Sequence, residues 1–377
     1  MTPIKPLISG TLSQRDLTKT TEWLCQQQRS SGEIPWSQGA KTDPWDHVHA
    51  AMGLTVMGRV EEAKAAYRFM ADTQDPNGGW PTERRGGKAT RVTQDSNHAA
   101  YLATGLWHLY CYRPDPDFLA EMWPTLERAL NFVLAMQLPT GAIAWAQKNG
   151  KVWEAPLLTG SSSIHGSLVC AIRIAERLGH HRPGLVRARE KLSRVIRNQP
   201  AVFSDTDLPE KPGRHSMDWY YPVLGGALRG AEGRRRLLDA SLTAAFIQEG
   251  AGCRCVKDQP WYTVAETCEL VLALHASGLT QRAREILSWT RWQRTDNGAY
   301  WTGTTFPACE IFPDGEQTTW TAAAVLLAHD AVHLDSRTSD FFTSLDGADL
   351  YDSAKPARPR PERPVSPDYV SLRTPAE

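Results

Sequence analysis

The chain has 377 residues, of which 41% are hydrophobic and 22% are charged, a composition typical of globular proteins. Lys and Arg together number 42, as do Asp and Glu, so no net charge attracts the protein to a nucleic acid or an anionic membrane. The start of the chain lacks the apolar core of a signal peptide, and no apolar stretch is long enough to span a bilayer. We therefore expect a cytoplasmic protein with reduced thiols, no nucleic acid partner and no integral membrane segment.

Two kinds of helical segment follow one another along the chain. The first kind is amphipathic and charged on one face, which predicts surface helices over residues 13–28, 60–74, 118–137, 183–198, 232–249 and 280–293. The second kind is apolar and small on nearly every side, which predicts buried helices over residues 45–58, 96–110, 162–178, 219–230, 262–276 and 317–333. The two kinds alternate strictly, so the sequence predicts an all-α fold, a single (α/α)6 toroid of six helical hairpins.

The lengths of the connections indicate where function lies. Buried helices lead to the next surface helix through short turns, whereas surface helices lead to the next buried helix through long loops, among them 29–44, 75–95 and 138–161. All long loops must then emerge on one face of the toroid, and long loops on a rigid scaffold commonly carry function. We place the toroid at residues 13–335, between an N-terminal arm (1–12) and a proline-rich, disordered C-terminal tail (336–377).

A short pattern recurs after four of the surface helices: a Gln near the helix end, then a Gly, then a Trp. The copies are Gln28, Gly32 and Trp36; Gln74, Gly78 and Trp80; Gln137, Gly141 and Trp145; and Gln293, Gly298 and Trp301. We expect the Gly to end the helix, the Gln to reach its uncapped carbonyl groups, and the Trp to fold back over its end. This interpretation makes the Gln and the Gly structural.

The string from Gln74 to Trp80 resembles the repeat of the terpenoid cyclase and protein prenyltransferase toroids, and the resemblance extends over residues 10–335. It implies an enzyme acting on an isoprenoid. The catalytic motifs of that group do not carry over, because Asp43-Pro44-Trp45-Asp46 supplies only two of the acids of an Asp-x-Asp-Asp run and no matching zinc ligands are present. The chain also resembles the six-hairpin glycosidase toroids, which place acids at the starts of their inner helices, as this chain does.

Polar residues gather where each buried helix begins, and the toroid brings these six starts to one rim. Carboxylates within apolar helices are costly unless paired or used, so Asp46, Asp218 and Glu266 are the candidate catalytic acids. His98 and His165 are candidate general acids or bases, with a core role as the alternative for each. The candidate substrate-binding residues are Asp43, His47, Trp80, Asp95, Trp145, Ser162, Tyr220, Tyr221, Arg254, Glu269, Trp301, Glu316 and Trp320. Helix capping is the competing interpretation for Asp43, Asp95, Ser161, Ser162 and Thr318.

The favoured hypothesis is an enzyme that acts on a saccharide through carboxylate acid–base chemistry, because the polar rim and the loop tryptophans, Trp153 among them, suit a hydroxyl-rich ligand. A prenyltransferase-like or cyclase-like enzyme and a non-catalytic binding toroid are the alternatives. The last predicts that the rim acids pair with Arg254 or Arg91. We expect a small-molecule or oligosaccharide substrate, no cofactor and no metal, since His47 and His49 point in different directions on a helix. Substrate identity, reaction type and oligomeric state stay open.

Overall fold

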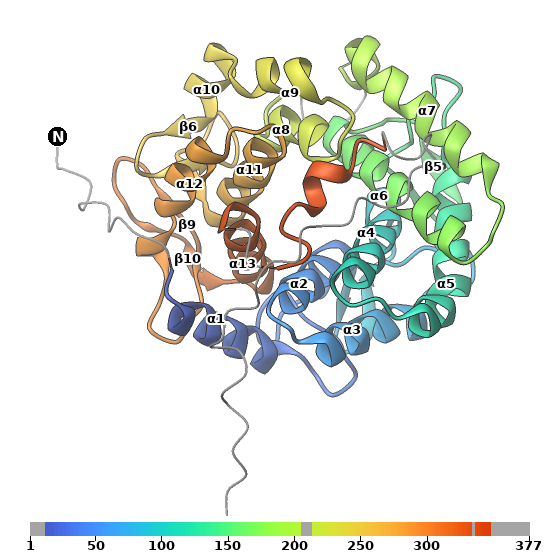
Figure 1. The fold of residues 1–377 in the computed structure, drawn as a ribbon, viewed down its shortest axis with the longest axis horizontal. Coiled ribbons are helices and arrows are strands. Elements are labelled where there is room, and N and C mark those ends of the chain that lie inside the picture. Colours follow the sequence, from blue (N-terminus) through green and yellow to red (C-terminus); the bar gives the residue numbers. More distant parts are fainter. Residues whose placement is uncertain (1–11, 205–212, 334–335, 348–377) are drawn as a thin grey trace, which may run out of the picture.

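The computed structural model describes residues 12–204, 213–333 and 336–347, which form two concentric rings of helices (Figure 1). The inner ring consists of α2 (Pro44–Val56), α4 (Ser96–Tyr112), α6 (Leu158–Arg177), α8 (Met217–Leu224), α11 (Val264–Ala276) and α13 (Thr319–His333). Each inner helix contacts the next in this order, and α13 contacts α2, so the ring closes. None of the helices in the described part of the chain is long and apolar enough to cross a membrane.

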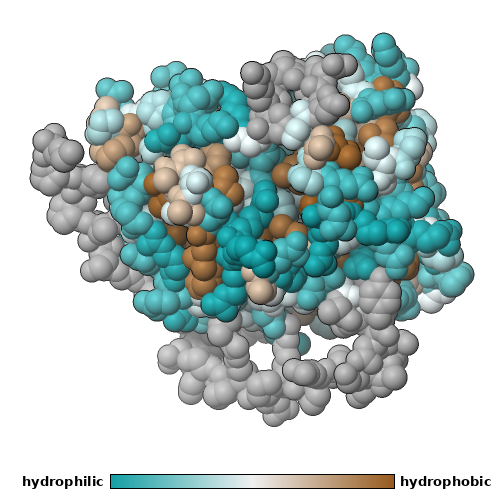
Figure 2. All heavy atoms as spheres, turned by 90° about the horizontal axis from the view of Figure 1, so that it is seen from above, coloured by the Kyte–Doolittle hydropathy of each residue, from teal (hydrophilic) through white to brown (hydrophobic). Residues whose placement is uncertain are grey.

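The outer ring is made of amphipathic helices whose charged faces give the side of the molecule in Figure 2 its mostly hydrophilic surface. Its members are α1 (Gln14–Gln27), α3 (Val60–Asp72), α5 (Pro116–Ala135), α7 (Pro183–Asn198), α9 (Gly230–Leu237), α10 (Ala240–Phe246) and α12 (Thr280–Ser288). Three 3-10 turns complete the described helical structure: η1 (Pro200–Phe203), η2 (Arg291–Gln293) and η3 (Phe341–Ser344). Most of the predicted helices agree with these bounds.

The predicted bounds of two helices are too wide. The inner helix expected over 219–230 ends at Leu224, because Gly226 has φ +82°, the left-handed conformation that ends a helix. The outer helix expected over 232–249 is divided into α9 and α10. Asp239 causes the division, since its side chain accepts from Leu242 N and begins a new helix.

Side-chain caps fix where several inner helices begin. The Asp43 carboxylate accepts from Asp46 N at 2.9 Å, and Asp95 accepts from Asn97 N at 2.7 Å, so both act as the N-caps that the sequence suggested. Thr318 accepts from Thr321 N in the same way. Ser161 and Ser162 do not cap, because α6 begins three residues earlier, at Leu158.

The fold is predominantly helical but not strictly all-α, because the long loops carry short antiparallel strands. These are β1 (Glu83–Arg85) with β2 (Lys88–Arg91); β3 (Gln94–Asp95), β4 (Ala146–Lys148) and β5 (Lys151–Trp153); and β6 (Ile247–Gln248), β7 (Gly252–Arg254), β8 (Trp261–Thr263), β9 (Trp301–Thr305) and β10 (Ile311–Gln317). Strands from different loops pair with one another, β3 with β4 and β8 with β9. The long loops therefore share one face, the mouth of the ring at which the inner helices begin.

The recurring Gln joins neighbouring outer helices. Gln74 Nε2 donates to the carbonyls of Gly78 and of Thr125 on α5, both at 2.9 Å. Gln28 and Gln137 make the same pair of bonds, to Gly32 and Glu62 and to Gly141 and Ala188. The sequence interpretation was wrong on the partners: the carbonyls belong to the loop Gly and to the next outer helix. Trp80 does fold back, since its Nε1 donates to the carbonyl of Met70 in α3.

The recurring Gly lets each loop pass close to the next outer helix. A Cβ at Gly78, where φ is +92°, would lie 2.2 Å from the Arg128 carbonyl oxygen, and one at Gly32 would lie 2.2 Å from that of Ala65. At Gly298 the same test meets the backbone of Lys19 at 2.5 Å. Because Lys19 belongs to α1, this last copy joins the end of the outer ring to its beginning.

The start of the predicted tail is ordered. Phe341, Phe342 and Leu345 are buried, and η3 crosses the middle of the ring (Figure 1). Arg173, Arg189 and Arg229 donate to backbone carbonyls of this segment. The prediction of a loose tail is therefore wrong for residues 336–347, where aromatic side chains find apolar partners at the end of the ring away from the mouth. Residues 348–377, and the arm up to residue 11, lie outside the described residues.

Alanine at Gly78 tests the contact between outer helices. We expect Gly78→Ala to lower the free energy of unfolding by about 3–5 kcal/mol, because the added Cβ is strained by the positive φ and collides with the backbone of α5. Gly87→Ala, at φ +77° with no atom within 4 Å of the added Cβ, is the matched control and should cost about 1 kcal/mol. Urea denaturation measures both, and equal losses would show that the contact contributes nothing.

Candidate active site

The first turn of α2 places two carboxyl groups side by side. Asp43 caps the helix, and Asp46 lies one turn on, 8% exposed. Burial raises the pKa of Asp46 well above its usual value, and the charge of Asp43 and a hydrogen bond to it raise it further. Burial also acts to raise the pKa of Asp43, but the hydrogen bonds from Asp46 and the charges of His98 and Lys41 hold it below its usual range. The pKa values of the two neighbouring carboxyl groups are thus shifted in opposite directions.

A third carboxyl group lies on α11, which is separated from α2 in the inner ring by α13 alone. Glu269 is fully buried and accepts from the hydroxyls of Tyr220 at 2.7 Å and Tyr221 at 2.8 Å. Burial raises the pKa of Glu269 to about 8; the hydrogen bonds from the two tyrosines oppose the rise, and the charge of Glu266 adds to it. Glu269 in turn contributes to the raised pKa of Asp46, so the acids of α2 and α11 share one electrostatic environment.

Glu266 occupies the first turn of α11, one turn before Glu269. It is 5% exposed, and its Oε2 is buried without a hydrogen-bond partner among the described residues. The thiol of Cys255 lies beside it: burial raises the pKa of Cys255, and the Glu266 carboxylate raises it further. A buried carboxylate oxygen without a partner carries a desolvation cost that a bound water or sugar hydroxyl would relieve.

Aromatic rings line the wall between α13, α2 and α4. Trp45 stacks on Tyr101 with ring centroids 4.7 Å apart and contacts Trp320 edge-on at 6.0 Å, while Trp36 packs on Trp320 at 5.8 Å. Trp36 Nε1 donates to Glu316 Oε1 at 2.8 Å. Trp45 and Tyr101 were not among the candidates, because inside an apolar segment their pattern is that of core residues. Trp36 was named only as a loop tryptophan.

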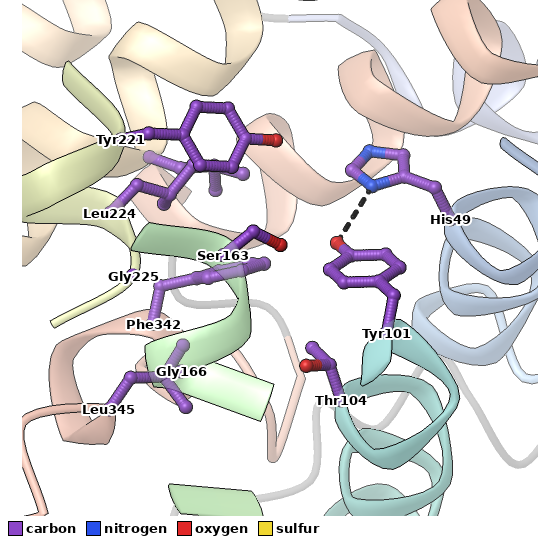
Figure 3. Close-up of a pocket in the computed structure, with 11 residues that line it drawn as sticks. His49, Tyr101, Thr104, Ser163, Gly166, Tyr221, Leu224, Gly225, Phe342 and Leu345 are labelled. Atoms are coloured by element: carbon purple, nitrogen blue, oxygen red, sulfur yellow. Dashed lines mark hydrogen bonds between the residues drawn. The ribbon is translucent and has the colours of Figure 1, made fainter. Parts of the chain in front are cut away.

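Beneath this wall a cavity of about 20 Å³ lies on the axis of the ring, room for about one water molecule. Figure 3 shows His49 and Tyr101 on one side of it and Tyr221, Phe342 and Leu345 on the other. His49 Nδ1 is 3.1 Å from the Tyr101 hydroxyl, and burial lowers the pKa of His49 to about 3, so the ring is neutral. The segment from η3 therefore closes the site from below.

The polar atoms of several candidates are engaged by neighbouring groups of the scaffold. Asp218 accepts from the Thr159 hydroxyl at 2.7 Å and from Gly213 N at 2.9 Å. The His165 ring lies 2.8 Å from the Gly225 carbonyl, and burial lowers its pKa to about 4. The remaining members of this group bond to neighbouring backbone or side chains: His47 to Ile34 and Ala66, Trp80 to Met70, Ser162 to Leu158 and Arg254 to Tyr262. Each has local partners that account for its position.

The other rim candidates stay at the mouth. Asp95 accepts from Trp145 Nε1 at 2.7 Å, and Glu316 accepts from Thr302 at 3.0 Å. Trp301 lies on β9, half-buried beside Gly315. His98 lies near enough to Asp43 to lower its pKa, and its Nδ1 is buried without a partner among the described residues. Those residues also contain no group of three or more His, Cys, Asp or Glu arranged to hold a metal ion.

The binding-module alternative predicted that arginines neutralise the rim acids. Arg254 instead donates to the Tyr262 hydroxyl and the Lys257 carbonyl, and Arg91 pairs with Glu83, with Nε 3.6 Å from Oε2. Asp46 and Glu269 keep strongly raised pKa values. The rim acids are therefore not neutralised by Arg254 or Arg91, and their shifted pKa values are typical of a functional site.

No family model matches the chain. It is 42% identical over 341 residues to the MMP endo-(1,4)-3-O-methyl-alpha-D-mannosidase of Mycolicibacterium hassiacum, covering 90% of this chain and 92% of that protein. A glycosidase variant in complex with glucose has a TM-score of 0.64 at 16% identity, over 86% of this chain and 99% of its own. A D-mannose isomerase has a TM-score of 0.65 at 10% identity, over 88% and 100%. These comparisons support the resemblance to glycosidase toroids and not the prenyltransferase-like one.

The raised pKa of Glu269 predicts a pH dependence of stability. Its folded-state pKa of about 8 exceeds the ordinary 4.5, so the folded protein holds the proton more tightly. The free energy of unfolding should therefore fall as the pH rises from about 5 to about 8.5. In Glu269→Gln we expect a shallower fall, with Asp46 supplying part of what remains. Thermal unfolding across this range measures the slope. Glu285→Gln, at a half-exposed surface glutamate, should keep the wild-type slope; an unchanged slope in Glu269→Gln would contradict the assignment.

Proposed function

Because the chain belongs to the family of the MMP endo-(1,4)-3-O-methyl-alpha-D-mannosidase, we propose that it hydrolyses α-(1,4) bonds within chains of 3-O-methyl-mannose. The protein is a saccharide-acting enzyme of the glycoside hydrolase type. The isomerase of similar fold makes the fold alone insufficient to assign the reaction, so the proposal depends on the homologue and on the carboxyl groups of the mouth.

Asp46 supplies the general acid in this proposal. The observation that carries the assignment is the burial of Asp46 directly beside Asp43, which caps the same helix; this placement raises the pKa of Asp46, whereas that of Asp43 is lowered. A glycosidic oxygen must be protonated as its bond breaks, and a carboxylic acid with a raised pKa can do this near neutral pH. Burial in the first turn of α2 therefore suits Asp46 to donate that proton to the departing sugar.

Glu266 supplies the base. Its buried Oε2 has no protein partner among the described residues, which leaves it available to a water molecule. The carboxylate removes a proton from this water as the water oxygen attacks the anomeric carbon, which inverts the configuration there. Glu269 lies one turn deeper in α11 than Glu266. It is held by Tyr220 and Tyr221 and forms the floor of the site below Asp46 and Glu266.

Other rim residues bind the sugar hydroxyls. His98 Nδ1 is buried without a hydrogen-bond partner within the described residues, so it is available to a ligand. Asp43, Asp95 and Glu316 hold neighbouring side chains or helix starts in place. We leave Asp218 and His165 out of the reaction, because their polar atoms are engaged by the scaffold.

Substitutions of the two carboxyl groups test the proposal on a 3-O-methyl-mannose oligosaccharide. We expect Asp46→Asn and Glu266→Gln each to lower kcat by about 10²–10⁴-fold, the usual contribution of a general acid or base. Asp218→Asn is the matched control and should keep kcat within about threefold, since that carboxylate is bound by Thr159 and Gly213. NMR of the first-formed product should show the inverted anomer. Full activity in Asp46→Asn, or a retained anomer, would refute the corresponding role.

A further inference from the structure

Two aromatic pairs stand on the loops of the mouth, outside the carboxylate centre. The first is formed by Trp145 and Trp153 on the β4–β5 hairpin, with ring centroids 5.5 Å apart and planes inclined by 31°. Trp153 is 36% exposed, an unusual position for a tryptophan in the folded part of this chain. Exposure of an indole face to water is unfavourable, and contact with an apolar ligand surface would remove that cost.

This first pair is tied to the inner ring. Trp145 Nε1 donates to Asp95 Oδ2 at 2.7 Å, and the other oxygen of Asp95 accepts from Asn97 N and so caps α4. The same strand that carries Asp95 pairs with β4, Asp95 opposite Ala146. The hairpin is therefore held at a fixed place relative to the start of α4, and a ligand can bind to the pair without first ordering a loop.

The second pair is formed by Trp261 and Phe312, which stack at 4.6 Å with planes 15° apart. Trp261 begins β8, which leads directly into α11 and Glu266. Phe312 lies on β10, next to Ile311, which is 45% exposed. This pair is likewise built on strands that connect to the inner ring, so its distance from the carboxylate centre is fixed.

The two pairs lie on opposite sides of the ring. In Figure 1 the β4–β5 hairpin is beside α6 and α7, and β9 and β10 are on the other side, beside α12 and α13. In the order of the inner helices, α4 and α6 stand opposite α11 and α13, and the carboxyl groups of α2 and α11 lie at the mouth on which both pairs stand. A straight chain laid over the mouth can reach both pairs while one of its bonds lies at the carboxyl groups.

We propose that Trp145–Trp153 and Trp261–Phe312 are two sugar-binding platforms, one on each side of the cleaved bond, and that they select long, O-methylated saccharide chains. This proposal rests on the hydrolytic function proposed above. An O-methyl group replaces a hydroxyl donor with apolar surface, which favours packing on an aromatic face over solvation. Binding on both sides of the centre places an internal bond there, as endo cleavage requires.

The test uses the full chain with Trp153→Ala, Trp261→Ala and the matched control Trp107→Ala. Trp107 stacks on Tyr110 near the far end of α4, away from the mouth, so its loss removes an aromatic pair of the same kind. The substrates are a long 3-O-methyl-mannose oligosaccharide and the shortest one that the wild type cleaves. For the long substrate, we expect each platform variant to raise KM about tenfold with little change in kcat, and Trp107→Ala to leave both unchanged. For the short substrate, all variants should match the wild type.

The positions of the cuts add a readout that a loss of stability would not produce. Trp153→Ala and Trp261→Ala should shift the cut positions in opposite directions along the long chain, because each removes binding on one side only. Trp153→Tyr keeps a ring and should restore the wild-type KM and cut pattern. An equal rise in KM on the long and the short substrate, or an unchanged pattern of cuts, would overturn the platform proposal.

A binding measurement separates this proposal from the hydrolytic one. Calorimetry with the Asp46→Asn protein and the long oligosaccharide should show about tenfold weaker binding once Trp153→Ala is added. If the wild type cleaves no such chain yet this difference appears, the platforms stand and the hydrolytic proposal fails. If cleavage occurs and binding does not change, the hydrolytic proposal stands and the platforms fail.

Discussion

At three of the four recurring loop glycines, the contact with the backbone of another outer helix leaves no room for a side chain, and the spacing of these helices in the ring depends on it. At Gly32, Gly78 and Gly298 the gap is too small for a Cβ, and beside the first two a glutamine bonds to both sides of the gap. Since the last of these contacts joins the end of the outer ring to α1, the spacing between hairpins is set by backbone rather than by variable side chains. With that spacing fixed, six inner helices begin at one end of the molecule, and their first turns face one another.

The chemistry of the mouth follows from this convergence. A helix N-terminus favours a negative charge, whereas burial disfavours one, and the two effects compete wherever an inner helix begins with an acid. On α2 the two effects act on different residues: Asp43 accepts from a backbone N–H and its pKa is lowered, whereas the pKa of the buried Asp46 is raised. On α11 no side chain caps the helix, and burial raises the pKa of Glu269 in spite of two tyrosine donors. Carboxyl groups with oppositely shifted pKa values therefore arise at one mouth.

The sequence predicted most of the architecture because hydrophobic periodicity and small-residue helices report directly on which faces are buried. Prediction from the sequence failed where contacts between distant segments determine the local structure. The partners of Gln74 depend on the neighbouring helix, and Phe341 belongs to a segment whose composition resembles a tail. Among candidate site residues, those in first turns of inner helices reach the mouth, whereas His165 lies a turn deeper and bonds to a core carbonyl. The sequence did not indicate that Tyr101 belongs to the site, since an aromatic residue in an apolar helix has the same pattern whether it faces a core or a cleft.

The segment from residue 336 to residue 347 also governs how a polymer can move through this molecule. Phe341, Phe342 and Leu345 fill the axis of the ring at the end away from the mouth, and three arginines hold the backbone there. A saccharide chain therefore cannot pass through the centre of the ring. It has to settle on the mouth from above, and both fragments of a cut chain return to solvent through that one opening.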